Sequence, residues 1–182
     1  MASEVILRDA RPDELGAVSA LLSASYEEYL PAATADLSNE ERRAWDGYRA
    51  DIADVASRAP YSDQIIAEAD GTILGAVTFF GPGHEAHYPN EASGDQHWPP
   101  EWASFRLLGV HPDARGRGIG RLLTGECIRR ARSLGVPVLA LHTTFLMVVA
   151  RDMYVKMGWG RAPKYDFFPM PGFTVEAYTL EL

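Results

Sequence analysis

Glycine and arginine alternate in one short segment, residues 110–120, which reads VHPDARGRGIG. Gly116, Gly118 and Gly120 leave backbone N–H groups accessible, and Arg115 and Arg117 flank them with positive charge. Such N–H groups at the start of a helix form an anion-binding cradle, because the helix dipole adds positive potential. The segment lacks the Gly-Lys-Ser/Thr of a Walker loop and the glycine spacing of a dinucleotide-binding turn. We therefore predict a turn that binds a diphosphate group, with a solvated turn as the alternative.

A second group of reactive side chains lies in residues 81–102, which contain four prolines, three glycines, three histidines and two tryptophans without regular periodicity. Loops of this length are uncommon unless they bind a ligand or are disordered. His84, His87 and His97 make a zinc site an alternative, but their spacing matches no established metal motif and we predict none. Trp98 and Trp102 either cage a cationic or aromatic substrate or anchor the loop to the body of the protein.

Apolar periodicity places the glycine–arginine turn between a strand and a helix of a mixed α/β fold. Strands are expected at residues 4–8, 64–68, 72–80, 105–110, 138–143 and 173–180, with Asp70-Gly71 as a hairpin turn. Helices are expected from Pro12 to Pro31, from Asn39 to about residue 56, from Gly120 to about residue 134, and over about residues 146–157. This order favours an α+β fold with a mixed, mostly antiparallel central sheet flanked by about four helices.

Length and composition limit the class of protein. The chain has 182 residues, which predicts one domain over residues 1–182. Cys127 is the single cysteine, so an internal disulfide and a cysteine-based zinc site are excluded, and a small buried hydrophobic role is expected for it. No apolar run approaches the roughly 18 residues of a membrane span, and the first residues lack a signal-peptide pattern. We therefore expect a cytoplasmic protein.

Charge is distributed unevenly along the chain. The net charge is −8, which argues against the broad basic face that binds nucleic acid or anionic lipid. Residues 1–101 hold 19 acidic and 6 basic residues, whereas residues 102–182 hold 6 acidic and 11 basic ones. This asymmetry predicts an anionic ligand on the second half, and the acidic half could attract a cationic partner such as an amine.

The glycine–arginine segment resembles the cofactor motif of the GNAT superfamily of N-acetyltransferases, V-x-P-x-x-R/Q-G-x-G-x-G/A, which follows the fourth strand of that fold. Val110, Pro112, Arg115 and the three glycines match it. The resemblance implies that N–H groups of residues 115–120 bind the pyrophosphate of acetyl-coenzyme A, and that the preceding strand pairs with its pantetheine arm. The expected cofactor-binding residues are Leu108, Gly109, Val110, Arg115, Gly116, Arg117, Gly118, Ile119, Gly120 and Arg121.

A later segment, residues 150–159 (ARDMYVKMGW), is similar to the A-x-x-x-Y-x-x-x-G-F/W signature of the same superfamily. The tyrosine of that signature usually lies near the thioester sulfur, where a phenol can protonate the departing thiolate. Such general acid assistance is typically worth roughly 10²–10⁴-fold in rate. The resemblance thus makes Tyr154 the catalytic candidate. The alternative is that Tyr154 belongs to a core stripe with Ala150, Met153 and Met157.

Two positions depart from the family pattern. Ser104 stands where several relatives carry a glutamate, and a serine is no base at neutral pH. Met147 stands where many relatives place an asparagine that binds the pantetheine. Replacement bases could be Glu68, Glu101, His84, His87 or His97, or the amine could arrive already deprotonated. His142 lies near the expected cofactor arm, and its role is open.

The resemblance implies transfer of an acetyl group from acetyl-coenzyme A to a primary amine of a small molecule or peptide. The amine would attack directly in a ternary complex, with a strand N–H stabilising the developing oxyanion. A non-catalytic acetyl-coenzyme A sensor is the alternative, since Ser104 and Met147 depart from the pattern, and a binding protein for another diphosphate is a third. The sequence does not identify the amine, and a homodimer is the commonest closed assembly.

Overall fold

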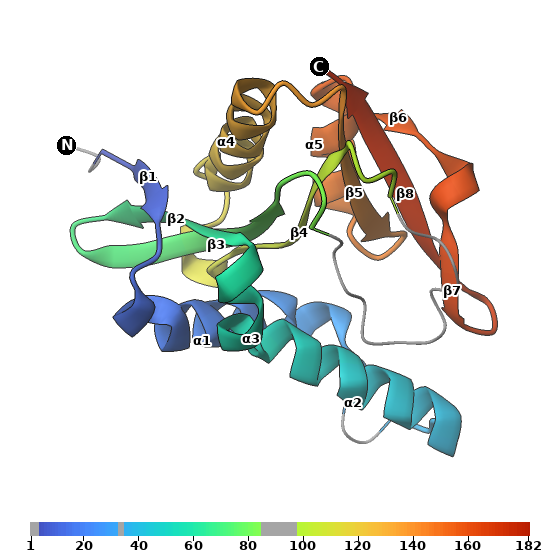
Figure 1. Cartoon of the computed structure of the whole chain (residues 1–182). Helices are drawn as coiled ribbons and strands as arrows, with labels where there is room; N and C mark the ends of the chain where they lie inside the picture. Colours follow the sequence, from blue (N-terminus) through green and yellow to red (C-terminus); the bar gives the residue numbers. More distant parts are fainter. Residues whose placement is uncertain (1–3, 33–34, 85–97) are drawn as a thin grey trace.

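The computed structural model describes residues 4–32, 35–84 and 98–182, and its centre is one mixed sheet (Figure 1). Within these residues the strand order is β1-β2-β3-β4-β5-β8-β6, with β7 added to β8. All neighbouring strands are antiparallel except β4 and β5, which are parallel. The strands are β1 (Ile6–Asp9), β2 (Asp63–Ala69), β3 (Thr72–Phe80), β4 (Ala103–Val110), β5 (Val138–Thr144), β6 (Gly160–Arg161), β7 (Phe167–Met170) and β8 (Phe173–Glu181).

Helices cover both faces of the sheet (Figure 1). On one face lie α1 (Leu15–Tyr26), α2 (Asn39–Ala53) and α3 (Val55–Arg58), and on the other lie α4 (Ile119–Ser133) and α5 (Val148–Lys156). Each face has its own buried core: Leu22 and Ile52 pack with Ile66 on the α1 side, and Leu123 and Tyr154 pack with other sheet residues on the α4 side. The sheet therefore holds two helical layers in fixed positions around β4 and β5.

Local sequence explains where the functional helices begin. The Ser38 hydroxyl accepts a hydrogen bond from the Glu41 N–H, and the Glu41 carboxylate accepts one from the Ser38 N–H, which forms a capping box for α2. Gly118, at φ +77°, precedes the first residue of α4 in a left-handed conformation that favours glycine. One or two residues thus determine where each of the helices α2 and α4 begins.

The predicted fold class is confirmed: the sheet is mixed and mostly antiparallel, with helices on both faces. The described residues contain five α-helices rather than about four, because the one-turn helix α3 has no periodicity that sequence reasoning detects. Strands β6 and β7 escaped prediction for the same reason. The first helix ends at Tyr26, and a 3₁₀ turn over Glu27–Tyr29 continues it toward Pro31. None of the described helices is long and apolar enough to span a bilayer.

Candidate active site

The two parallel strands at the centre of the sheet separate partway along their length. β4 and β5 pair only over Ala103–Phe105 and Leu139–Leu141. Beyond that point β4 continues to Val110 beside β3, and β5 continues to Thr144 beside β8. The edge of β4 that faces β5 therefore has no ladder partner after Phe105 within the described residues. This opening between two rigid strands can receive an extended ligand that pairs with strand backbone.

A β-bulge alters β4 at the mouth of this opening. The β3–β4 register shifts between Ala76 and Thr78, and Leu107 adopts φ +54°. A bulge breaks the alternation of side chains along a strand. As a result Arg106 and Leu107 both line the same cavity on the α1 side, whereas Leu108 packs with the α4-side core. A positive φ at a leucine is rare and marks a backbone that the surrounding sheet holds in place.

The predicted diphosphate turn follows β4 directly. Gly116 and Gly118 have φ values of +75° and +77°, and a Cβ atom built at either glycine meets nothing within 4 Å. The first bond of α4 runs from the Leu122 N–H to the Gly118 carbonyl, so the N–H groups of the three preceding residues have no partner within the helix. The turn thus presents open backbone donors at a positive helix end. Of the expected contacts here, Ile119 can offer only its N–H, because its side chain is buried in the core.

The arginines of the turn differ in their contacts. Arg115 forms an ion pair with Glu28, with 2.6 Å between Nη1 and Oε1, and donates from Nη2 to the Ser25 carbonyl at 3.1 Å. It therefore ties the turn to the end of α1. Arg117 and Arg121 are exposed, and no ion pair with another described residue holds them. These two guanidinium groups are consequently the ones available to an anion at the turn.

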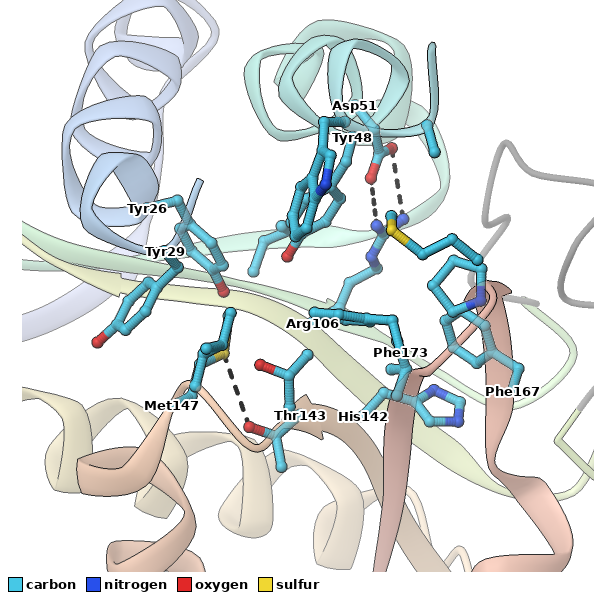
Figure 2. A pocket seen from close by; sticks show the side chains of 18 residues that line it. Tyr26, Tyr29, Tyr48, Asp51, Arg106, His142, Thr143, Met147, Phe167 and Phe173 are labelled. Atoms are coloured by element: carbon cyan, nitrogen blue, oxygen red, sulfur yellow. Dashed lines mark hydrogen bonds and ion pairs between the residues drawn. The ribbon is translucent and has the colours of Figure 1, made fainter. Parts of the chain in front are cut away.

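A cavity of about 100 Å³ lies at the mouth of the opening, between α2, the ends of β4 and β5, and the β7–β8 hairpin (Figure 2). Most of its wall is aromatic or aliphatic. The Tyr26 hydroxyl, on this wall, donates to the Leu108 carbonyl at 3.3 Å and so links the cavity to β4. Among the described residues, the tyrosine, tryptophan and phenylalanine side chains that line it are those of Tyr26, Tyr29, Trp45, Tyr48, Phe167 and Phe173.

One buried ion pair interrupts the apolar wall. Arg106 from β4 binds the carboxylate of Asp51 from α2 through both terminal nitrogens, as Figure 2 shows. Arg58 approaches the same carboxylate, with 3.6 Å between Nη1 and Oδ1, and also donates to the carbonyls of Asp51 and Ile52. The three side chains are at most 10% exposed. Such a pair is held by geometry and hydrogen bonds, because isolated buried charges are costly.

His142 lies on the β5 wall of the cavity. Its Nε2 lies 2.8 Å from the Tyr165 carbonyl oxygen, which can only accept, so Nε2 carries the proton of the neutral ring. Burial lowers the pKa of His142 to about 4. The Trp98 ring stacks on it at 4.5 Å between centroids. His142 is therefore a neutral, oriented part of the wall at physiological pH.

A family model described as the acetyltransferase (GNAT) family matches residues 19–159. The chain belongs to the GNAT family. This confirms the resemblance in the cofactor motif and places the chain in a family of acetyltransferases.

Individual GNAT relatives agree with this assignment. A mycothiol acetyltransferase of Cellulomonas flavigena is 37% identical over 98 residues, which are 53% of this chain and 26% of that protein. The chain therefore matches about a quarter of the length of that relative. The structure of a ribosomal-protein-alanine N-acetyltransferase from Brucella melitensis is 21% identical, with a TM-score of 0.60 and coverage of 97% of this chain and 99% of that one. The structure of yncA, a putative acetyltransferase from Salmonella typhimurium with its cofactor acetyl-CoA, is 16% identical, with a TM-score of 0.61 and coverage of 99% and 95%.

The tyrosine of the second GNAT motif lies in the core behind the opening. Tyr154 packs against Phe105, at 6.1 Å between ring centroids, and against Trp159, at 5.9 Å. It is 4% exposed, and burial raises the pKa of its phenol, so the hydroxyl keeps its proton. Cys127 lies in the same core, where burial raises the pKa of its thiol, as expected for a small buried hydrophobe.

None of the described base candidates lines the cavity. Glu68 pairs with Arg8 at the far edge of the sheet, and Glu101 and His84 lie outside the cavity wall. His87 and His97 lie outside the described residues, and with them the alternative zinc site. Ser104, which replaces the family glutamate, is buried in the centre of the sheet between Phe80 and Ala140.

The two tryptophans match the anchoring alternative better than a substrate cage. Trp98 stacks on His142, and both Trp98 and Trp102 pack against Tyr165, at 5.1 and 5.3 Å between centroids. Neither lines the cavity. Met147, which replaces the family asparagine, does line it and accepts a weak hydrogen bond from the Thr143 hydroxyl at 3.6 Å.

Sequence reasoning missed the Arg106–Asp51 pair and the aromatic wall. Asp51 and Arg106 are 55 residues apart, and each looks like an ordinary charged residue in its own segment. A single signal was available: Arg106 interrupts an otherwise apolar strand, which is unusual in the middle of a buried sheet.

Proposed function

We propose that this chain is an acetyl-coenzyme A-dependent N-acetyltransferase that acts on a primary amine. One observation carries the proposal: a diphosphate-type turn, an unpaired strand edge and a cavity of small-molecule size follow one another along β4. A long ligand that ends in a small reactive group can bind all three together. The motif matches and the GNAT family membership support the same reading.

The residues present fit acetyl-coenzyme A. Open N–H groups at Gly116–Gly120 and the guanidinium groups of Arg117 and Arg121 suit a pyrophosphate. The β4 edge over Leu108–Val110 offers backbone groups to the amides of a pantetheine arm. Gly109 also allows α1 to pack closely against β4. A Cβ at this position would lie only 2.9 Å from the Ser25 Cβ.

Acetyl-coenzyme A supplies an acyl group activated as a thioester when it is bound. The chain's own contribution is to orient an amine at the mouth of the opening and to exclude water with the aromatic wall. The bulge at Leu107 turns backbone away from the regular ladder, and a β4 N–H there is the proposed donor to the developing oxyanion. Tyr154, protonated at neutral pH, is the proposed acid for the departing thiolate.

The attacking amine must also lose a proton, and a base in the cavity could accept it. Among the lining residues that the structure describes, the one carboxylate belongs to Asp51, which two guanidinium groups already hold. We therefore propose that the amine reacts in its neutral form and that its proton leaves to solvent. The rate should then rise with pH toward the pKa of the free amine.

Two measurements test the proposed function. Calorimetric titration should show micromolar binding of acetyl-coenzyme A and much weaker binding of ATP. Release of free coenzyme A thiol in the presence of a panel of amines should then exceed the release without amine. Preference for ATP would indicate a binding protein for another diphosphate. Tight binding of acetyl-coenzyme A without turnover of any amine would indicate a sensor.

A further inference from the structure

The cavity beside the β4 bulge has properties that narrow the class of amine, provided that the proposed function holds. Its volume is about 100 Å³. An engineered apolar cavity of about 150 Å³ in another protein takes up benzene. The space here therefore accepts one compact group, such as a short branched chain or, after small side-chain adjustments, a single ring. Sugars of several rings and long polyamines exceed it.

The wall favours an apolar group. Four of the aromatic side chains form one continuous surface: Tyr26 contacts Tyr48, Tyr48 contacts Trp45, and Trp45 contacts Phe173, at 5.4–6.4 Å between centroids. In Figure 2, Tyr26 and Tyr48 lie toward one end of the cavity and Phe167 lies at the other. Contiguous rings in edge-to-face and tilted contact form a rigid, preformed surface, which binds apolar groups with little loss of conformational freedom.

Within the described part of the chain, the charged residues on the wall, Asp51 and Arg106, are already paired with each other. Asp51 receives Arg106 and Arg58, so its carboxylate is unavailable to a second ammonium on the acceptor. Two guanidinium groups close to the same point would also repel such a cation. Arg106 points at Asp51 (Figure 2), so a carboxylate on the acceptor would have to displace a buried pair. An acceptor with one amine and no other charge avoids both costs.

We infer that the acceptor is a primary monoamine with a compact, uncharged apolar body. The amine nitrogen forms a bond to the acetyl carbon, and the carbon–sulfur bond of the thioester breaks. The amine loses one proton to solvent, and the departing thiolate gains one from the proposed acid Tyr154, which solvent then reprotonates. The apolar body fills the aromatic cavity and the amine faces the opening between β4 and β5. The cavity therefore selects against acceptors that carry a second charge as well as against acceptors that are too large.

Two matched pairs of acceptors isolate the effect of charge. Pentylamine and 1,5-diaminopentane differ by one ammonium, and 3-methylbutylamine and L-leucine differ by one carboxylate. We expect kcat/KM for each monoamine to exceed that of its charged partner by about 30-fold or more, because the added charge must be buried without a partner. Free coenzyme A thiol is measured at saturating acetyl-coenzyme A and at equal concentrations of the unprotonated amine.

Two variants of α2 isolate the effect of the cavity. Ala44 lines it, whereas Ala50 is exposed on the same helix. Ala44→Leu should raise KM for 3-methylbutylamine by about 10-fold, since added methylenes fill the space that the substrate needs. Ala50→Leu makes the same chemical change and should leave KM unchanged. Both variants should keep the wild-type affinity for acetyl-coenzyme A, which shows that they are folded.

The outcomes separate this inference from the proposed function. Monoamine preference together with a selective effect of Ala44→Leu supports the inference. Equal or better turnover of 1,5-diaminopentane or L-leucine overturns it and leaves N-acetylation in place, and so does an equal KM in the two α2 variants. Turnover of other amines of the panel but of none of these four also overturns the inference and leaves N-acetylation in place. Binding of acetyl-coenzyme A with no turnover of any amine of the panel removes the proposed function, and the inference with it.

Discussion

Substitution of Gly118, the left-handed glycine just before α4, tests most directly whether the 110–120 turn binds the cofactor. Gly118 has a φ of +77°, and a Cβ atom added there meets no other atom within 4 Å. Replacing it with alanine therefore introduces no collision within the protein. The substitution changes only the backbone preference, so its effect isolates the conformation of the turn from its chemistry.

The size of this effect follows from the backbone geometry. A left-handed conformation costs an L-residue with a Cβ roughly 1–2 kcal/mol relative to its preferred region. Gly118 is exposed and lies two residues after exposed Gly116, so the turn of the free protein can relax to escape the strain. Acetyl-coenzyme A must then restore the original turn. We therefore expect the dissociation constant of Gly118→Ala to rise by about 5–30-fold.

Calorimetric titration with acetyl-coenzyme A measures this change directly. Gly118→Asn gives a graded comparison, because asparagine tolerates the left-handed region better than alanine, and its affinity should lie between those of the wild type and the alanine variant. Gly125→Ala serves as the matched control. Gly125 is within α4 and also has open space around it, so alanine there should stabilise the helix by about 1 kcal/mol without changing affinity.

Two results would refute the reasoning. Equal affinities of Gly118→Ala and the wild type would show that the turn conformation does not matter for binding. Weaker binding by Gly118→Asn than by Gly118→Ala would show that side-chain volume, rather than backbone strain, controls the site.

Three further predictions concern β4, α5 and β5. Gly109→Ala should lower the free energy of unfolding by about 1–3 kcal/mol in denaturant titration, because the new Cβ would lie 2.9 Å from the Ser25 Cβ. Tyr154→Phe should lower kcat by roughly 10²–10⁴-fold with little change in acetyl-coenzyme A affinity, since it removes only the proposed acid. His142 has an unfolded pKa of 6.5 and a folded pKa of about 4, so its contribution to stability is complete above pH 6.5 and is lost as the pH falls toward 4. His142→Phe should remove about 3 kcal/mol of this pH dependence in unfolding experiments between those two values.

Each of these predictions has a clear contrary result. Wild-type stability of Gly109→Ala would mean that α1 does not approach β4 as closely as described. An unchanged kcat of Tyr154→Phe across the pH range would remove the acid role and leave Tyr154 as a core residue only. A stability profile of His142→Phe that matches the wild type between pH 4 and 6.5 would mean that folding does not lower the pKa of this histidine.

Several features of the site are determined locally and could be predicted from the sequence. The glycine spacing of residues 116–120 defines the turn, because glycine alone adopts its left-handed backbone without strain. The apolar period of α4 and the Asp70-Gly71 turn between the apolar runs of β2 and β3 locate the elements around it. The GNAT fold and the cofactor segment followed from these local signals together with the two motifs.

The acceptor side of the site is decided by tertiary structure. The side chains of Asp51 and Arg106 meet only because α2 packs over the end of β4, 55 residues away in the chain. The positive φ of Leu107 results from the shift in register between β3 and β4, because nothing in leucine favours it. Arg115 remains a predicted cofactor contact, and the additional contacts of its guanidinium with Glu28 and Ser25 arise only because the turn packs against another element. Backbone conformation at glycine is a property of the residue itself, whereas a cavity and a buried ion pair are properties of elements that only the packed sheet brings together.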